Sequence, residues 1–224
     1  PLVDQVLDVA GQKGTGRWTA IDAVEGGIAL STIVAAVEAR ALSAKRDDRQ
    51  SMAEAIGFDT PQVEGISVDD LEQALYAAKI MSYTQGFAML SARSKERGYG
   101  TNLAEVARIW KAGCIIRAKF LDRVHAAFDA QPDLPLLALD ASFAQEIRAA
   151  LPAWRRVVSQ AVLHGIPVPA LSASLQYLDT LRTPRGSAAL LQAQRDWFGA
   201  HTYRRIDAPD VPVHTAWQDL PSVD

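Results

Sequence analysis

The sequence predicts an all-α domain with two long central helices and an extended C-terminal tail. Apolar residues recur at helical spacing along most of the chain, whereas the alternation typical of a strand is confined to residues 211–215. Strands and helices do not alternate, so a parallel nucleotide-binding sheet is not expected here. With 224 residues the chain is long enough to bury a sizeable core. We therefore expect one domain over residues 1–224, in which residues 201–224 form the tail.

The first long helix is predicted over residues 19–44. This run contains no proline, is rich in Ala, Ile, Leu and Val, and follows a glycine-rich turn. Gly26 and Gly27 are costly inside a helix and indicate a kink or close packing. The polar residues 45–55 are compatible with an extension of this helix, and a loop is expected over residues 57–65.

The second long helix is predicted over residues 67–96. Ser67, with Asp70 three residues later, resembles a helix-capping arrangement, and Gly98 is a typical helix end. Pro152 suits the first turn of a helix, where its missing N–H has no intrahelical partner to lose. The remaining helices are expected at residues 102–113, 115–130, 140–150, 152–165, 168–181 and 187–200.

Composition excludes several classes of function. Lys and Arg number 23 against 26 Asp and Glu, a net charge of -3, which argues against general nucleic-acid binding. No apolar run approaches the ~20 residues needed to cross a bilayer, so no membrane association is expected. The single cysteine, Cys114, excludes an internal disulfide and a cysteine-based zinc site, and it is most simply a small buried apolar residue. A reducing, cytoplasmic location is expected.

One candidate binding segment is Gly11–Trp18, with the sequence GQKGTGRW. Glycines allow a backbone to approach a ligand closely, and the N-terminus of a helix attracts anions. Lys13 adds a full positive charge and Thr15 a hydroxyl, so the segment suits a phosphate. It lacks the spacing and the preceding strand of a nucleotide-binding loop. The alternative is a flexible turn in which Thr15 caps the following helix.

Two further candidates carry arginine. Arg40 lies among Ala, Val and Leu near the end of the first long helix, either paired with a partner or extended towards solvent as a surface residue. Residues 192–203, QAQRDWFGAHTY, combine aromatic and polar side chains in a way that suits a segment presenting Arg195 and His201 to an anion. The alternative is an amphipathic terminal helix with both polar groups in water.

Taken together, these motifs resemble the C-terminal helical domain of the 6-phosphogluconate dehydrogenase family. The resemblance covers nearly the whole chain. The matching segments are QKGTGRWT (12–19), EARALS (38–43), LYAAKIMSYTQGFAML (75–90), IWKAGCIIRAKFL (109–121), WRR (154–156), HGIPVPALSASLQYLD (164–179), LLQAQRDWFGAHTY (190–203) and VHTAW (213–217).

The resemblance implies an NADP-dependent oxidative decarboxylation of 6-phosphogluconate to ribulose 5-phosphate, in the pentose phosphate pathway. It implies that Lys13, Thr15 and Arg40 bind the phosphate end of the substrate. It also implies a homodimer in which Arg195 and His201 reach the pocket of the neighbouring subunit. Charge-assisted hydrogen bonds from such groups to a phosphate contribute roughly 1.5–3 kcal/mol each.

The resemblance further implies that a Rossmann coenzyme domain and the general acid and base precede this region, so no catalytic residue is expected in the chain and the chain alone is expected to be inactive. The start of the sequence, which lacks an initiating Met, leads to the same expectation of a fragment. Two alternatives remain open. One is a helical dimerisation module without catalysis, and the other is the corresponding domain of a related hydroxyacid dehydrogenase.

Overall fold

The computed structural model describes residues 1–113 and 119–219. Its contacts group the chain into two compact units, unit 1 (Pro1–Leu178) and unit 2 (Asp179–Asp224), which we describe separately. The expectation of a single domain stays a prediction. Cys114 and the start of the predicted helix 115–130 lie outside the described residues.

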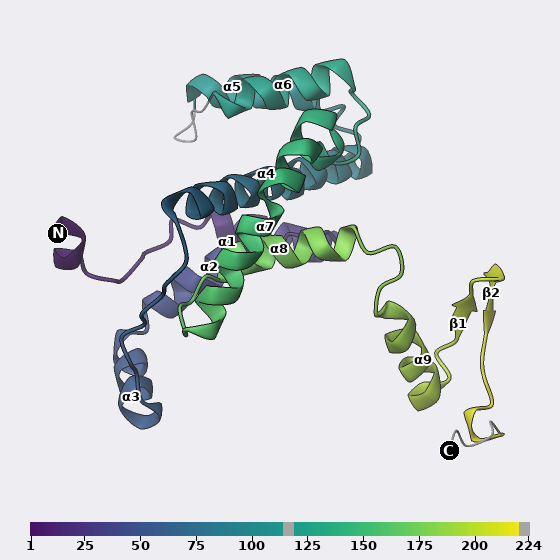
Figure 1. Cartoon of the computed structure of the whole chain (residues 1–224). Coiled ribbons are helices and arrows are strands. Elements are labelled where there is room, and N and C mark those ends of the chain that lie inside the picture. The colour runs from purple at the N-terminus through teal and green to yellow at the C-terminus, as the bar shows by residue number, and fades with distance from the viewer. Residues whose placement is uncertain (114–118, 220–224) are drawn as a thin grey trace. The chain divides into compact units, whose positions relative to one another are not determined.

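Unit 1 is built from helices. In chain order they are α1 (Thr15–Glu25), α2 (Ser31–Ser43), α3 (Arg46–Ile56), α4 (Val68–Arg97), α5 (Leu103–Gly113), α6 (Phe120–Ala130), α7 (Ala141–Leu163) and α8 (Pro169–Leu181), the last of which crosses into unit 2 (Figure 1). Two short 3-10 helices complete the unit: Leu2–Gln5 lies before α1, and Leu137–Leu139 lies between α6 and α7. The predicted all-α fold class is confirmed.

Helix α4 matches its prediction because both of its ends are set by local signals. The Ser67 hydroxyl accepts a hydrogen bond from the Asp70 N–H at 3.0 Å, and the Asp70 carboxylate accepts one from the Ser67 N–H at 3.0 Å. This reciprocal pair is a capping box. At the other end, Gly98 adopts a left-handed φ of 67°, a conformation that favours glycine.

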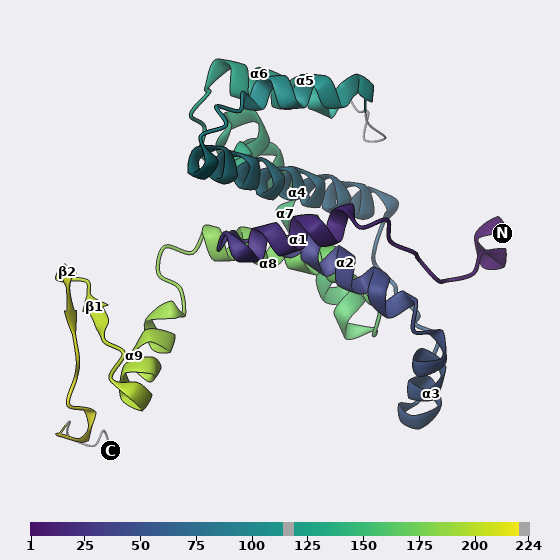
Figure 2. The ribbon, with the colours of Figure 1, turned by 180° about the vertical axis from the view of Figure 1, so that it is seen from behind.

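The predicted long helix over residues 19–44 is wrong, because the chain breaks into α1 and α2. Gly27 has a φ of +63°, and the Ile28 N–H bonds back to the Ala23 carbonyl at 2.8 Å. This hydrogen-bond pattern ends a helix and turns the chain. Helices α1 and α2 then pack against each other, on the side of α4 opposite to α5 and α6 (Figure 2).

The predicted boundary near Pro152 is also wrong, because α7 is one helix of 23 residues that contains this proline. The core-facing positions keep helical spacing on both sides of it, so packing of one continuous face overrides the local preference of proline. The buried residues of this face are Phe143, Ile147, Ala150, Ala153, Trp154, Val157, Val158 and Ala161. The two long central helices are therefore α4 and α7, which pack together.

The main core lies between α4, α7 and the neighbouring helices α5, α6 and α8. Trp154, Phe143 and Phe87 are at most 1% exposed, and the Trp154 indole N–H donates to the Leu171 carbonyl at 3.3 Å. A smaller cluster of Ala23, Leu30 and Met89 joins α1 and α2 to α4. These two clusters give unit 1 its apolar support.

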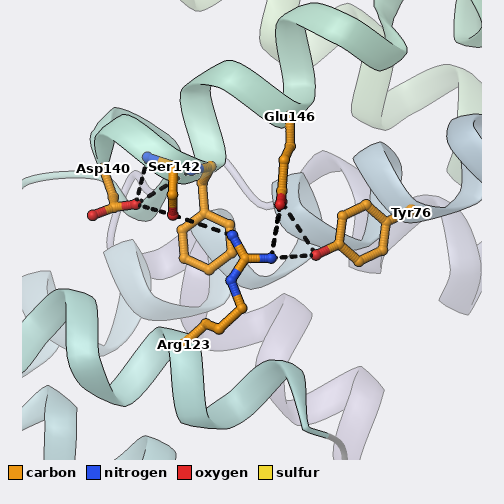
Figure 3. A network of polar contacts seen from close by, with 6 residues as sticks. Tyr76, Arg123, Asp140, Ser142 and Glu146 are labelled. Carbon is orange, nitrogen blue, oxygen red and sulfur yellow. Dashed lines mark hydrogen bonds and ion pairs between the residues drawn. The ribbon is translucent and has the colours of Figure 1, made fainter.

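Polar contacts at the edge of the core join α4, α6 and α7 (Figure 3). The Arg123 guanidinium donates to the Tyr76 hydroxyl at 2.8 Å and pairs with the Glu146 carboxylate at 2.9 Å. It also donates to Ser142 at 3.1 Å, next to the N-cap Asp140 of α7. Since these partners are already paired with one another, the cluster serves to fasten three helices.

Unit 2 consists of α9 (Ala188–Gly199), a two-stranded antiparallel sheet and the short 3-10 helix Trp217–Asp219. Strand β1 (Tyr203–Arg205) pairs with β2 (Ala208–Val213), with Tyr203 opposite Val213 and an irregularity between Arg204 and Arg205. The predicted extended tail is thus a hairpin, and its strand lies slightly earlier than the predicted residues 211–215.

Candidate anion-binding site

The glycine-rich segment forms the N-terminus of α1. Gly14 is the N-cap, with a left-handed φ of 100°, and its carbonyl accepts the Trp18 N–H at 2.9 Å. Thr15 is the first helical residue, so the alternative in which Thr15 caps the helix is wrong. Among the described residues, neither the Lys13 ammonium nor the Thr15 hydroxyl has a hydrogen-bond partner. Both groups are exposed and available to a ligand.

Arg40 lies in the last turn of α2 and links that helix to the glycine-rich segment. Its guanidinium donates to the Gly11 carbonyl. Nearby, the Gln12 side chain donates to the Val37 carbonyl at 3.4 Å, and the Ala10 N–H donates to the Ser43 hydroxyl at 3.0 Å. These bonds fasten residues 10–12 along the end of α2, and Arg40 keeps further N–H donors exposed.

Lys13, Thr15 and Arg40 line one open pocket of about 940 Å³. The lining includes the contact between α1 and α2, where a Cβ on Gly16 would lie 2.9 Å from the Val37 side chain. Gly16 thus permits the close approach of the two helices. Two positive charges, a hydroxyl and a helix N-terminus meet at this pocket, an arrangement that suits an anion with several oxygens.

Two polar contacts attach the helices α1 and α2, which contribute to this pocket, to α4. The Gln85 side chain, fully buried, accepts the Thr32 N–H at 3.0 Å and donates to the Thr32 hydroxyl at 2.7 Å. The Arg93 guanidinium, also buried, pairs with the Asp22 carboxylate at 3.0 Å. The first contact fixes the start of α2, and the second fixes the end of α1. Sequence inspection did not identify either pair, because the partners lie more than 50 residues apart.

The other two predicted site residues belong to unit 2. Arg195 is exposed on α9, and its guanidinium donates to the Gln192 side chain at 3.3 Å. His201 is exposed in the turn between α9 and β1, with its ring against Gly199. Unit 2 therefore presents both side chains to solvent on one short stretch of chain.

Between these two residues lies Asp196, a buried carboxylate that sequence inspection did not single out. It is 0% exposed and accepts hydrogen bonds at 2.8–3.0 Å from the Thr202 N–H, the His214 ring, the Thr215 N–H and the Trp217 indole. Burial raises the pKa of this carboxyl, but the four hydrogen bonds outweigh it and lower the pKa from 3.8 to about 2. The only hint in the sequence was an Asp next to an aromatic pair.

Two other kinds of site were sought in the described parts of the chain. Within residues 1–113 and 119–219, no cluster of His, Cys, Asp and Glu could hold a metal ion. Within the same ranges, no helix has the length and apolar character required to cross a membrane.

Comparison with known proteins gives a consistent result. The family model of the 6-phosphogluconate dehydrogenase C-terminal domain matches residues 1–217. A chloroplastic decarboxylating 6-phosphogluconate dehydrogenase of Oryza sativa is 51% identical over 228 residues, covering 98% of this chain and 45% of the relative. The decarboxylating enzyme of Synechococcus elongatus is 50% identical, covering 97% of this chain and 47% of the relative.

A solved structure is also similar. The Plasmodium falciparum 6-phosphogluconate dehydrogenase, described in its apo form and in complex with its cofactor NADP+ and its substrate 6-phosphogluconate, superimposes with a TM-score of 0.91 at 43% identity. The match covers 96% of this chain and 47% of that chain. The chain thus spans about half the length of the relatives it matches.

Proposed function

The chain belongs to the 6-phosphogluconate dehydrogenase family, and on that premise we propose that it forms the substrate-binding and dimerisation half of a protein that oxidatively decarboxylates 6-phosphogluconate with NADP. The observation that carries the proposal is the meeting of Lys13, Thr15 and Arg40 at one pocket. An ammonium, a hydroxyl and a guanidinium, all groups suited to phosphate oxygens, line this pocket on helices attached to α4.

We assign no residue of this chain to NADP or to proton transfer. In the described parts of the chain the sheet is a two-stranded antiparallel hairpin, which does not fit a dinucleotide. Coenzyme binding and the acid and base are proposed to lie in the part of the relatives that this chain does not span. Location in the cytoplasm stays a prediction, since the relatives include a chloroplastic enzyme.

Arg195 and His201 are proposed to complete the pocket of the partner subunit in a homodimer. Their exposure leaves them free for such a contact. Large apolar side chains of α9 are exposed as well, which favours an interface over a free surface. These are Leu190, Leu191, Trp197 and Phe198, between 55% and 76% exposed.

A substitution in the full-length protein tests the assignment of Arg195. Arg195→Ala removes a charge-assisted hydrogen bond and should raise the KM for 6-phosphogluconate at least tenfold, on the order expected for such a bond. Arg182→Ala is the matched control, because Arg182 is also an exposed arginine, paired with Asp179. An unchanged KM in Arg195→Ala, or an equal rise in the control, would refute the role.

Mixed dimers test whether Arg195 acts in the pocket of the partner subunit. One subunit carries Lys13→Ala and the other Arg195→Ala, and each homodimer is impaired in all of its sites. If Arg195 acts on the partner, each mixed dimer contains one intact site, and an equimolar mixture that has exchanged subunits recovers about one quarter of the wild-type sites. No recovery in dimers that are shown to have exchanged would mean that Arg195 acts within its own subunit.

A further inference from the structure

Unit 2 is organised around a carboxylate in place of an apolar core. Among its described residues, 179–219, Asp196 is the one residue that is buried. Its hydrogen bonds come from three separate segments: the turn after α9, the residues that follow β2, and the 3-10 helix Trp217–Asp219. One side chain thus joins the end of α9 to both ends of the hairpin.

The turn that carries His201 has an unusual backbone. Ala200 has a φ of 51° and Thr202 a φ of 61°, and within the described ranges these are the two residues other than glycine with positive φ. Left-handed backbone is unfavourable for alanine and more so for a β-branched threonine. Such a conformation persists when surrounding contacts impose it.

Asp196 supplies these contacts on both sides of His201. Its main-chain carbonyl accepts the Ala200 N–H at 2.9 Å, and its carboxylate accepts the Thr202 N–H at 2.9 Å. The two left-handed residues that flank His201 are therefore both bonded to the same amino acid.

The His201 ring is held from a third direction by Gly199. A Cβ at position 199 would lie 2.9 Å from the His201 Nε2 and 3.0 Å from its Cδ2. The ring therefore packs against the glycine backbone, which a larger residue would obstruct. Backbone strain, a buried carboxylate and a glycine surface all act on one exposed histidine.

We propose that Asp196 is a positioning residue for His201, which fixes the left-handed turn so that the imidazole is presented in one orientation to the bound anion. This inference rests on the proposed function, in which His201 contacts 6-phosphogluconate. Asp196 itself is buried and does not touch the substrate. Its effect on binding passes through the turn, and this route distinguishes it from a residue that only stabilises the fold.

A double-mutant cycle in the full-length dimer tests this route. His201→Ala should raise the KM for 6-phosphogluconate about tenfold, and Asp196→Asn should raise it at least about threefold, with kcat changed less than about twofold in each. Because Asp196 acts through His201, the double variant should have the KM of His201→Ala alone. Multiplication of the two effects in the double variant would overturn the inference while leaving the role of His201 intact. An unchanged KM in His201→Ala would overturn both.

A matched control separates positioning from general loosening of unit 2. Arg205→Ala removes the ion pair of 2.8 Å between the Arg205 guanidinium and the Asp207 carboxylate, in the same unit, and neither of these residues bonds to Asp196. Its KM should equal that of the wild type. A rise as large as that in Asp196→Asn would overturn the specific role of Asp196.

A second variant keeps the test decisive if Asp196→Asn does not fold. The double substitution Ala200→Gly with Thr202→Gly retains the hydrogen bonds of Asp196 and permits positive φ, but it frees the turn to sample other conformations. We expect the melting temperature to change by no more than about 3 °C and the KM to rise at least about threefold. A wild-type KM would show that a fixed turn is not needed and would overturn the inference.

Discussion

The two units present the proposed anion-binding groups on different kinds of support. In unit 1, Lys13 lies in the segment just before α1 and Arg40 lies on α2, and these two helices pack on α4 beside an apolar core. In unit 2, Arg195 and His201 flank a single buried carboxylate, and the apolar side chains around them are exposed. The first support is non-directional burial, and the second is a small set of directed hydrogen bonds.

Because the two supports differ, different perturbations should destabilise the two units. An apolar core loses stability gradually as atoms are removed, and it does not respond to protons. A buried carboxylate with four donors depends on its charge and on the geometry of each bond. Unit 2 should therefore be sensitive to acid and to small changes of the turn, whereas unit 1 should be sensitive to loss of volume.

The largest expected effect comes from a pair of tryptophan truncations. Trp154→Ala in unit 1 removes a side chain that is 0% exposed and should cost about 3–5 kcal/mol of unfolding free energy. Trp197→Ala in unit 2 removes a side chain that is 57% exposed and should cost less than about 1 kcal/mol. Urea unfolding followed by far-UV circular dichroism measures both. Similar costs would contradict the contrast between a core and an exposed aromatic surface.

Acid should remove the structure of unit 2 before that of unit 1. The folded pKa of Asp196 is about 2, below its ordinary value of 3.8, so the stabilisation is fully present above pH 4 and is lost as the pH falls through 2. The pKa of Asp70 in unit 1, lowered by its hydrogen bonds with Ser67 and Arg156, is also about 2. Its protonation frees one cap and one ion pair, but the apolar core remains.

The indole N–H resonance of Trp217 reports this transition, because that group donates to the Asp196 carboxylate at 2.8 Å. The resonance should move between pH 4 and 2, while that of Trp154, in the core, should keep its position. Trp217→Phe assigns the signal. Asp196→Asn should abolish the pH dependence of the Trp217 resonance. Simultaneous loss of both resonances would mean that the two units unfold together.

Sequence signals were sufficient where local chemistry decides the structure. The ends of α4 follow from the Ser67 and Asp70 cap and from the left-handed Gly98. They were insufficient where distant packing decides it. The face of α7 continues through Pro152 because both halves rest on the same core, and the local preference of proline for a helix start does not report this packing.

The candidate site shows the same division. Lys13, Thr15 and Arg40 were recognisable from their motifs, and the fold places them at one pocket. Gln85 and Asp196 were not recognisable, because a buried glutamine and a buried aspartate acquire their roles only from partners that the fold brings to them. Exposed polar groups beside glycine-rich motifs can be proposed as a site from sequence, whereas the buried groups that hold them in place are found only from a structure.

A buried glutamine tests how much the pocket of unit 1 also depends on directed bonds. Gln85→Leu leaves the N–H and the hydroxyl of Thr32 without their partner and should cost about 1–3 kcal/mol. Thr32→Val, which removes one of the two bonds, should cost less. Gln50→Leu, at an exposed position of α3, is the control and should be nearly neutral. Equal stability of Gln85→Leu and Gln50→Leu by urea unfolding would show that packing alone holds α2 on α4.

The smallest expected effects come from replacing one glycine by alanine in each unit. Gly26→Ala places a Cβ 2.7 Å from the guanidinium carbon of Arg93, which is 8% exposed and paired with Asp22. Since a buried arginine has little room to move, we expect a loss of about 1 kcal/mol. Gly199→Ala places a Cβ 2.9 Å from the end of the exposed His201 ring, which has room to shift.

Because alanine is a better helix former than glycine, Gly199→Ala should leave stability unchanged or raise it by up to about 1 kcal/mol. It should nevertheless raise the KM for 6-phosphogluconate, because the displaced ring no longer lies where the turn presents it. The two alanines thus separate the quantities that each unit controls, stability in unit 1 and ligand presentation in unit 2. Thermal unfolding and steady-state kinetics on both variants of the full-length protein measure this separation. A loss of stability in Gly199→Ala with an unchanged KM would reverse it, and would assign the glycine to folding alone.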